Sequence, residues 1–289
     1  MRAAVIGAGS IGLLLTARLV QSGAEAALVC RTKEQAGRIA AEGIRIRGGN
    51  GANAAVRPAA VYHWEEWRRE QFRQRKGSRP DWALLCVKQT HWSADLLEGL
   101  ARLASCGANI AAFQNGIGHA EILMEAGVPP DKLYLAVTTE GARREGPHAV
   151  AHTGRGGTWI GCAAGGAASG ELAPLLAQLK AAGFAAAEEP QIVKRLWRKL
   201  LVNAAINPPA AIFGARNGEL AETERYRRIM RAAFEEALAV AKAAGMAPEE
   251  EMWEEVLDVC RKTAGNDASM LQDVRAGRKT EIEAINGSL

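Results

Sequence analysis

Three polar residues recur at intervals of four in an otherwise apolar stretch of the chain. In WRKLLVNAAINP, from Trp197 to Pro208, they are Lys199, Asn203 and Asn207, which share one stripe if the stretch is an α-helix. A solvent-facing side of a helix is usually wider and richer in charge. An ammonium beside two amides could stabilise negative charge on a substrate oxygen and then protonate it. The alternative is that the three side chains satisfy polar groups at buried helix ends.

A glycine-rich motif stands at the beginning of the chain. AAVIGAGSIGLLLTARLVQSG combines an apolar strand, Gly7-x-Gly9-x-x-Gly12 and an apolar helix, and EAALVC follows as a second strand. Gly7 permits the tight turn, Gly9 lets the backbone approach a pyrophosphate, and Gly12 lets helix and strand pack closely. This context favours dinucleotide binding over a plain turn. The predicted cofactor loop consists of Gly7, Ala8, Gly9, Ser10, Ile11 and Gly12.

The residues after the second strand predict which cofactor binds. Proteins that prefer NAD usually carry Asp or Glu there, which accepts a hydrogen bond from the ribose. This chain has Arg31 after Cys30, and a guanidinium suits a 2′-phosphate through charge-assisted, bidentate bonds. We therefore predict NADPH/NADP+ as the cofactor. The alternative, a solvated charge at a helix start, is less favourable because the positive end of a helix disfavours a cation.

Two further polar residues follow apolar strands in the same half of the chain. Lys88 ends WALLCVK, and Asn115 follows NIAAF. Ligands bind outside the carboxyl ends of parallel strands in open α/β sheets, so both residues are candidate ligand contacts. Taken singly, Lys88 could be a surface charge at a strand end, and Asn115 could form an Asn-Gly turn with Gly116.

The pattern of apolar residues predicts two domains. The runs AAVIGAG, AALVCR, WALLCVK, NIAAFQNG and LYLAVTT predict buried strands, and HAVAHTG and GTWIGC predict later ones. From Gln191 onward almost only helical periodicity remains, in segments 192–207, 226–245, 248–265 and 268–286. The predicted fold class is α/β, with a Rossmann-type doubly wound parallel sheet in residues 1–189 and an all-helical C-terminal domain in residues 190–289. A ligand cleft is expected at their junction.

Composition excludes several classes of protein. With 48% hydrophobic and 24% charged residues, the 289-residue chain suits globular domains and not a disordered or collagen-like chain. No apolar run reaches the roughly 18 residues of a membrane span, and the first residues lack the features of a signal peptide, so we expect a cytoplasmic protein. The five cysteines form no CxxC pair, which predicts reduced thiols and no metal site. The net charge of +4, with its basic residues spread out, favours small anionic ligands over nucleic acid.

Four segments together resemble the ketopantoate reductase (2-dehydropantoate 2-reductase) family. They are LWRKLLVNAAINPPAAIFGARNGEL, NDASMLQDVRAGRKTEIEAINGSL, FQNGIG and TTEGARREGPHAVAHTGRG, and the match runs through the whole chain in the order of the family. Members of this family reduce the 2-keto group of ketopantoate with NADPH to give pantoate, a step towards pantothenate and coenzyme A. The resemblance implies an NADP-dependent oxidoreductase with a small-molecule substrate and no nucleic-acid or membrane partner. It is also compatible with a homodimer.

The resemblance assigns roles to individual residues. The catalytic lysine of the family falls on Lys199, and the essential glutamate, which would bind substrate hydroxyl groups, falls on Glu281. The contacts to the 2′-phosphate fall on Arg31 and Lys88. Asn115 is expected beside both the nicotinamide and the substrate. All substrate-side positions are Asn115, Asn203, Asn207, Asn217, Asn266 and Ser269.

Alternatives to this assignment stay open. Asn266, Asp267 and Ser269 could simply cap a helix, and Glu281 could be a first-turn acid. Another NADPH-linked reductase of 2-keto acids or imines could share the scaffold, because the shape of the pocket sets the substrate. A module that senses NADPH without catalysis would need the glycine loop, but it would not need Lys199, Ser269 and Glu281 together.

Two features depart from the family pattern. The chain ends at EAINGSL, where family members usually continue into a further helical stretch. The segment 61–82 holds three of the seven tryptophans among many charges and is longer than expected. We predict that 61–82 is an exposed amphipathic helix whose aromatic residues pack against the sheet, and not a nucleic-acid site.

Overall fold

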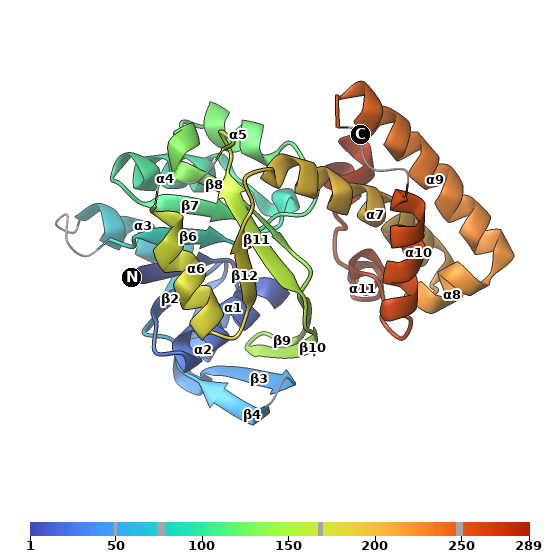
Figure 1. Ribbon diagram of the computed structural model, residues 1–289. Coiled ribbons are helices and arrows are strands. Elements are labelled where there is room, and N and C mark those ends of the chain that lie inside the picture. Colours follow the sequence, from blue (N-terminus) through green and yellow to red (C-terminus); the bar gives the residue numbers. More distant parts are fainter. Residues whose placement is uncertain (49–50, 74–78, 167–169, 247–250) are drawn as a thin grey trace. The chain divides into compact units, whose positions relative to one another are not determined.

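The chain folds into two compact units (Figure 1). The computed structural model describes residues 1–48, 51–73, 79–166, 170–246 and 251–289. The first unit contains Met1–Val87, His91–Gln114 and His119–Ile192. The second contains Lys88–Thr90, Asn115–Gly118 and Val193–Leu289, so two short loop pieces from the first half of the chain pack with the C-terminal helices.

An eight-stranded sheet forms the centre of unit 1. Its order is β12-β11-β8-β7-β6-β1-β2-β5, and every neighbouring pair is parallel except β8 with β11. Most of its inner strands are fully buried, as expected for a sheet that is covered on both faces. This sheet confirms the predicted Rossmann-type fold. The strands are β1 (Arg2–Ile6), β2 (Glu25–Cys30), β5 (Ala60–His63), β6 (Trp82–Leu85), β7 (Asn109–Ala112), β8 (Leu133–Thr138), β11 (Gly157–Cys162) and β12 (Ala185–Glu188).

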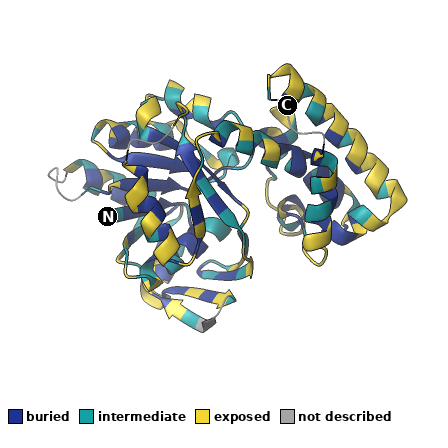
Figure 2. Ribbon diagram, in the orientation of Figure 1, coloured by how far each residue is buried: buried dark blue, intermediate teal, exposed yellow. Residues whose placement is uncertain are grey.

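Helices cover the large sheet, which is the most buried part of unit 1 (Figures 1 and 2). Buried leucines of α1 and α6, such as Leu13 and Leu175, share one core cluster with Leu28 of the sheet. On α4, Gly99 packs so closely on α3 that a Cβ would lie 2.7 Å from the Trp64 ring. The helices of unit 1 are α1 (Ser10–Gln21), α2 (Lys33–Glu42), α3 (Trp64–Arg73), α4 (Ala94–Ser105), α5 (His119–Glu125) and α6 (Leu172–Ala181), with short 3-10 turns at Gln89–His91 and Pro130–Lys132.

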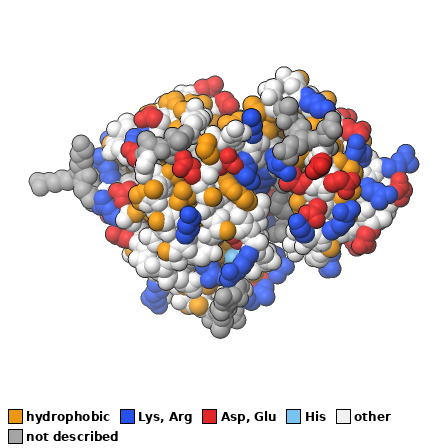
Figure 3. Space-filling view, viewed as in Figure 1, with side chains coloured by type: hydrophobic (Ala, Val, Ile, Leu, Met, Phe, Trp, Pro, Cys, Tyr) orange, Lys and Arg blue, Asp and Glu red, His pale blue; other side chains and the backbone are white. Residues whose placement is uncertain are grey.

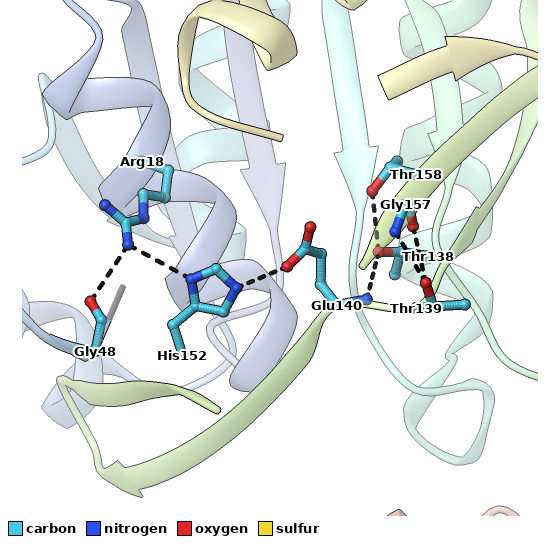
Figure 4. Close-up of polar contacts among 8 residues, drawn as sticks. All are labelled: Arg18, Gly48, Thr138, Thr139, Glu140, His152, Gly157 and Thr158. Atoms are coloured by element: carbon cyan, nitrogen blue, oxygen red, sulfur yellow. Dashed lines mark hydrogen bonds and ion pairs between the residues drawn. The ribbon is translucent and has the colours of Figure 1, made fainter. Parts of the chain in front are cut away.

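A second sheet of four strands lies against α1. Its order is β4 (Gly51–Val56), β3 (Ile44–Gly48), β10 (Ala149–Gly154) and β9 (Gly141–Gly146). Arg18 of α1 donates to the Gly48 carbonyl and contacts His152 Nδ1, both at 3.4 Å, and His152 Nε2 lies 2.7 Å from Glu140 Oε2 (Figure 4). Because an ionised carboxylate only accepts, this geometry fits an imidazole with its proton on Nε2. The buried His152 and Glu140 therefore link the small sheet to the helix that follows the glycine loop.

Unit 2 is built around one long helix, α7 (Ile192–Phe213). Its apolar residues share a core with Met230, Phe234 and Val256 of the surrounding helices. Figure 2 shows a long exposed side on α9, and Figure 3 shows acidic and basic side chains intermixed over this part of the surface. No helix of the described residues is long and apolar enough to cross a membrane. The other helices are α8 (Asn217–Glu222), α9 (Glu224–Ala243), α10 (Met252–Lys262) and α11 (Ser269–Arg275), and a π-helical turn covers Glu283–Gly287.

The prediction for the tryptophan-rich segment is wrong in its extent. Only Trp64–Arg73 is helical, because Ala60–His63 pairs with β2 as strand β5 and Trp82 begins strand β6. Residues 74–78 of the predicted helix lie outside the described residues. Trp67 and Trp82 are both buried, but Trp67 belongs to helix α3 and Trp82 to strand β6. The sequence alone did not predict this difference.

Two other expectations also need correction. The small four-stranded sheet was predicted only in part. HAVAHTG was expected as a strand and contains β10, but strands 141–146 and 44–48 were not expected, because they carry arginines and glycines and lack a continuous apolar run. The predicted helix over 268–286 is interrupted: α11 ends at Arg275, and Gly277 has a φ of +62°, which only glycine adopts readily. The chain becomes helical again only near its end.

Exchange of Gly12 for alanine should destabilise unit 1. A Cβ at Gly12 would lie 1.8 Å from the carbonyl oxygen of Gly7, so α1 must move, and overpacking of this kind costs about 1–3 kcal/mol. Gly37 is the matched control, because it lies in α2 with no atom within 4 Å of its Cβ position. Gly37→Ala should stabilise by about 0.5–1 kcal/mol. Thermal unfolding followed by circular dichroism measures both effects, and equal stability of Gly12→Ala and wild type would contradict the close packing.

Candidate active site

Glycines shape the loop between β1 and α1. Gly7 has a φ of +111°, and a Cβ there would lie 2.9 Å from the backbone of Cys86 and Val87. At Gly9, by contrast, no described atom lies within 4 Å of the Cβ position, so the backbone borders open space. α1 begins after Gly9 with no side-chain cap and no acidic residue in its first turn. Its first amide groups and the positive end of its dipole therefore suit a phosphate group.

The end of β2 provides a cation near this loop. The amide of Gly7 donates to the carbonyl of Val29 at 2.9 Å, so the loop and the end of β2 are adjacent. Burial raises the pKa of the Cys30 thiol to about 12, and the neutral thiol adds no charge there. Arg31 follows and is exposed. Thr32 caps α2 by accepting from the amide of Gln35 at 3.2 Å, so the exposed guanidinium comes directly before a capped helix.

Gln35 supports the glycine loop, a role that the sequence reasoning missed. Its Nε2 donates to the carbonyl oxygens of Ala8 at 3.0 Å and of Pro147 at 2.7 Å. One side chain therefore ties the glycine loop to the turn between β9 and β10. The only signal in the sequence is the spacing Thr32-x-x-Gln35, which is that of a capping box.

The polar stripe of α7 lies beside the buried middle of the helix, whereas Lys194, Arg198 and Ile212 of the same helix are exposed. Lys199 and Asn203 are partly buried and Asn207 is only 5% exposed. The predicted pattern of a polar stripe in a mostly buried helix is therefore present. The apolar neighbours are buried: Leu200, Leu201, Val202, Ala204, Ala205 and Ile206.

Asn115 bridges the lysine and the glutamate that the sequence singled out. Lys199 Nζ donates to Asn115 Oδ1 at 2.8 Å, and Asn115 Nδ2 donates to Glu281 Oε2 at 3.2 Å. Glu281 is 5% exposed, and the side chain of Gln89 holds the backbone of Asn115 by donating to its carbonyl at 2.8 Å. All four residues belong to unit 2, although they come from four segments of the chain.

The surroundings of Lys199 change its acidity. Desolvation by burial lowers its pKa from 10.5 to about 8, and the charge of Glu281 partly opposes this decrease. An ammonium with such a pKa is mostly charged at neutral pH and can still give up its proton readily. The three side chains therefore combine a proton donor, a bridging amide and a carboxylate.

Lys88 forms an ion pair within the same unit. Its Nζ lies 2.5 Å from Asp273 Oδ2, and Arg278 Nε lies 3.0 Å from the other oxygen of this carboxylate. Asp273 is only 3% exposed, and two cations compensate its charge. Asp273 and Arg278 were missed, because nothing local connects them to Lys88, which is 185 positions away from Asp273.

The remaining predicted substrate residues lie around α8 and α11. Asn217 is 7% exposed, and its side-chain Nδ2 donates to Thr263 Oγ1 at 2.8 Å. Its backbone N–H donates to the backbone carbonyl of Asn266 at 3.1 Å. These contacts connect Asn217 and Asn266 to each other. Ser269 is exposed at the first residue of α11, where the N-cap position is Ala268. The described residues contain no group of three or more His, Cys, Asp or Glu side chains that could hold a metal ion, and all five cysteines are free.

Sequence comparison decides the family. A model of the family "Ketopantoate reductase PanE/ApbA" matches residues 3–165, and a model of the C-terminal part of the same family matches residues 191–289. The chain belongs to the ketopantoate reductase family. The "2-dehydropantoate 2-reductase" of Bacillus subtilis is 34% identical over 100% of this chain and 89% of its own length. That of Halobacterium salinarum is 30% identical over 100% of this chain and 91% of its own length.

Solved structures agree with this membership of the ketopantoate reductase family. The 2-dehydropantoate 2-reductase of Methylococcus capsulatus matches with a TM-score of 0.82 at 28% identity, covering 100% of this chain and 88% of that one. A D-mandelate dehydrogenase in a ternary structure with NADH and anilino(oxo)acetate matches with a TM-score of 0.85 at 26% identity, covering 100% and 90%. The fold is thus shared with a protein that is named D-mandelate dehydrogenase.

Replacement of Glu281 by glutamine should lower the pKa of Lys199 below about 8. The buried ammonium would lose the opposing carboxylate that favours its charged form, while its desolvation would persist. The titration of lysine side chains by NMR, after isotopic labelling, measures this change. Lys262 is the internal control, because Asp258 raises its pKa at an exposed site of α10 and its titration should not change. An unchanged Lys199 titration in the Glu281→Gln protein would refute the electrostatic coupling.

Proposed function

We propose that this protein reduces 2-dehydropantoate (ketopantoate) to pantoate with NADPH, a reaction of pantothenate and coenzyme A biosynthesis. The observation that carries the proposal is the group formed by Lys199, Asn115 and Glu281, in which a lysine with a lowered pKa is bridged to a buried carboxylate. Membership of the ketopantoate reductase family supports the choice of reaction.

Unit 1 is the proposed binding site of the nicotinamide cofactor. The loop of Gly7, Gly9 and Gly12 and the uncapped start of α1 would hold the pyrophosphate. Arg31 would bind the 2′-phosphate, since its guanidinium is exposed and comes directly after β2. The bound NADPH would supply a hydride to the keto carbon. This division gives residues 1–189 the cofactor and residues 190–289 the main substrate contacts.

Lys199 is the proposed general acid. Hydride addition to a keto carbon leaves negative charge on the oxygen, which an ammonium stabilises and then protonates. The proton passes from Lys199 Nζ to that oxygen, and the product is an alcohol. The amine regains a proton from solvent before the next turnover. Because the pKa is about 8, most of the lysine is in the acid form at neutral pH.

Glu281 and the asparagines are the proposed substrate contacts. The Glu281 carboxylate would accept hydrogen bonds from hydroxyl groups of the substrate and orient it near Lys199, to which Asn115 already connects it. Asn203 and Asn207 follow Lys199 at one-turn intervals on α7, so their amides lie on the same side of the helix. Ser269, Asn217 and Asn266 would add contacts further from the proton donor.

A second candidate is the reduction of another small 2-keto acid on the same scaffold. The D-mandelate dehydrogenase with NADH supports it, because a chain of the same fold carries a different substrate name and NADH as the bound cofactor. The shape of the pocket, more than the lysine, distinguishes such substrates. A comparison of 2-keto acids with both cofactors therefore belongs in the first assay.

Wild-type protein should oxidise NADPH in the presence of ketopantoate, and Lys199→Ala should lose about 10²–10⁴-fold in kcat because the general acid is absent. Absorbance of NADPH measures turnover, and fluorescence titration measures NADPH binding, which the exchange should not change. Lys194→Ala is the control, since this lysine lies on the same helix and is exposed. Above a pH of about 8 the wild-type rate of reduction should fall about tenfold per pH unit, because the ammonium is lost.

A folded wild-type protein that binds NADPH and leaves ketopantoate unreduced would reject this substrate. Turnover of another 2-keto acid would then support the second candidate. If Lys199→Ala kept the wild-type rate and pH profile, Lys199 would not be the acid.

Arg31→Ala should raise the KM for NADPH by about tenfold or more and leave the KM for NADH nearly unchanged. The guanidinium would contact a phosphate that only NADPH carries, and one charge-assisted bond is worth about 1.5–3 kcal/mol. Arg38→Ala removes the same charge from an exposed position of α2, where Arg38 pairs with Glu42, and serves as the control. An equal loss for both cofactors would contradict a contact to the 2′-phosphate.

A further inference from the structure

The helix that carries Lys199 contains two prolines directly after the last residue of its polar stripe. Pro208 and Pro209 lie inside α7. Proline has no amide hydrogen, so the carbonyls of Ala204 and Ala205, four positions earlier, lack their helical donors. The proline ring also crowds the carbonyl four residues before it, which tilts that carbonyl away from the helix axis. A buried carbonyl without a donor is costly, and Ala204 is fully buried.

Asn286 supplies the missing donor to one of these carbonyls. Its Nδ2 donates to the carbonyl oxygen of Ala204 at 3.2 Å. The Oδ1 of the same amide is buried without a hydrogen-bond partner among the described residues. The bond to Ala204 is thus the polar contact that fixes this side chain. It joins the C-terminal turn to α7 at the residue after Asn203.

The same C-terminal turn is held on a second side by the loop that carries Asn115. The amide of Ile117 donates to the carbonyl of Ala284 at 3.4 Å. A Cβ on Gly116 would lie 1.8 Å from that carbonyl oxygen, so the two backbones are in direct contact. The turn continues from Glu281, whose own carbonyl accepts from the amide of Ile285 at 3.0 Å. Glu281 therefore begins a short segment that is fixed to the 115–118 loop and to α7.

We propose that Asn286 is a positioning residue for the active site: by donating to the carbonyl that Pro208 leaves without a helical donor, it holds the turn that carries Glu281 against the helix that carries Lys199. This inference rests on the proposed function, because it gives Asn286 its effect through these two residues. Asn286 itself needs no contact with substrate or cofactor.

The position of this turn matters because Glu281 acts over short distances. Its bond to Asn115 is 3.2 Å long, and Asn115 also accepts from Lys199. Without the Asn286 bond, the turn would keep its contact to the 115–118 loop and lose its side-chain bond to α7. Glu281 could then move relative to Lys199, and both the charge balance of the lysine and the orientation of the substrate would change.

Asn286→Leu removes the donor and keeps a side chain of similar size, and it tests the proposal by two measurements. The first is the NMR titration of Lys199 in protein without ligand. The pKa of Lys199 should fall by about half a unit or more, towards its value in the Glu281→Gln protein, because the carboxylate of Glu281 no longer lies close to the ammonium. The second is the steady-state rate, where kcat/KM for ketopantoate should fall about tenfold while the Kd for NADPH stays unchanged.

Ser288→Ala is the matched control. Ser288 Oγ donates to the carbonyls of Ala284 and Ile285 at 2.9 Å each, so this exchange removes side-chain bonds from the same turn but none to α7. It should leave the titration of Lys199 and kcat/KM at their wild-type values. A merely structural role of Asn286 would make both variants alike.

Pro208→Ala keeps the test usable if Asn286→Leu folds poorly. The new amide at position 208 can donate to the Ala204 carbonyl, so the double variant Pro208→Ala/Asn286→Leu should unfold at a higher temperature than Asn286→Leu alone. The turn would still lack its bond to α7, so the pKa of Lys199 should remain low in the double variant. An Asn286→Leu or double-variant protein that is folded and has the wild-type Lys199 titration would overturn the proposal. Absence of turnover in the wild type would instead reject the proposed function, and the titration would still decide about Asn286.

Discussion

The ammonium of Lys199 lies beside the buried middle of α7, and this arrangement constrains unit 2. Loss of hydration lowers the pKa of the ammonium to about 8, so the charged form needs partners from outside the helix. Asn115 accepts its hydrogen bond, and Glu281 adds a negative charge beyond that amide. A lysine at the same site without these partners would lose its charge at a lower pH. The charge of Glu281 therefore favours the protonated form of the lysine.

These partners come from segments that are distant in sequence, and this explains the composition of unit 2. The loop pieces Lys88–Thr90 and Asn115–Gly118 follow strands of the large sheet, yet they pack with the C-terminal helices. Gln89 holds the backbone of Asn115, and Lys88 pairs with Asp273 of α11. Each loop is thus fixed by a side-chain bond to a polar group of unit 2. The loops begin where strands β6 and β7 of the parallel sheet end. Their side chains are oriented by hydrogen bonds and ion pairs to residues of the C-terminal helices, such as Lys199 and Asp273.

Structural features that follow from the spacing of neighbouring residues could be predicted from the sequence, whereas contacts between residues far apart in the chain could not. The glycine loop, the apolar strands and the stripe on α7 follow from local spacing, and the structure has all three. In the small sheet, β10 was predicted, but strands 44–48 and 141–146 were missed because they lack an apolar run. Asp273, Gln35 and Asn286 were missed because their partners lie far away in the chain. Glu281 was indicated only by the family resemblance, since its sequence surroundings suit an ordinary first-turn acid.

The prolines of α7 leave backbone carbonyl groups of this helix without their helical hydrogen-bond donors. A regular helix satisfies its own carbonyls and offers no attachment point on its backbone. Pro208 leaves the carbonyl of Ala204 without a helical donor inside a buried helix, so a donor from another segment is strongly favoured there. That donor is Asn286, five positions after Glu281. The missing helical donor thus leaves a free backbone acceptor for the segment that brings the carboxylate, and a helix without Pro208 would lack this acceptor.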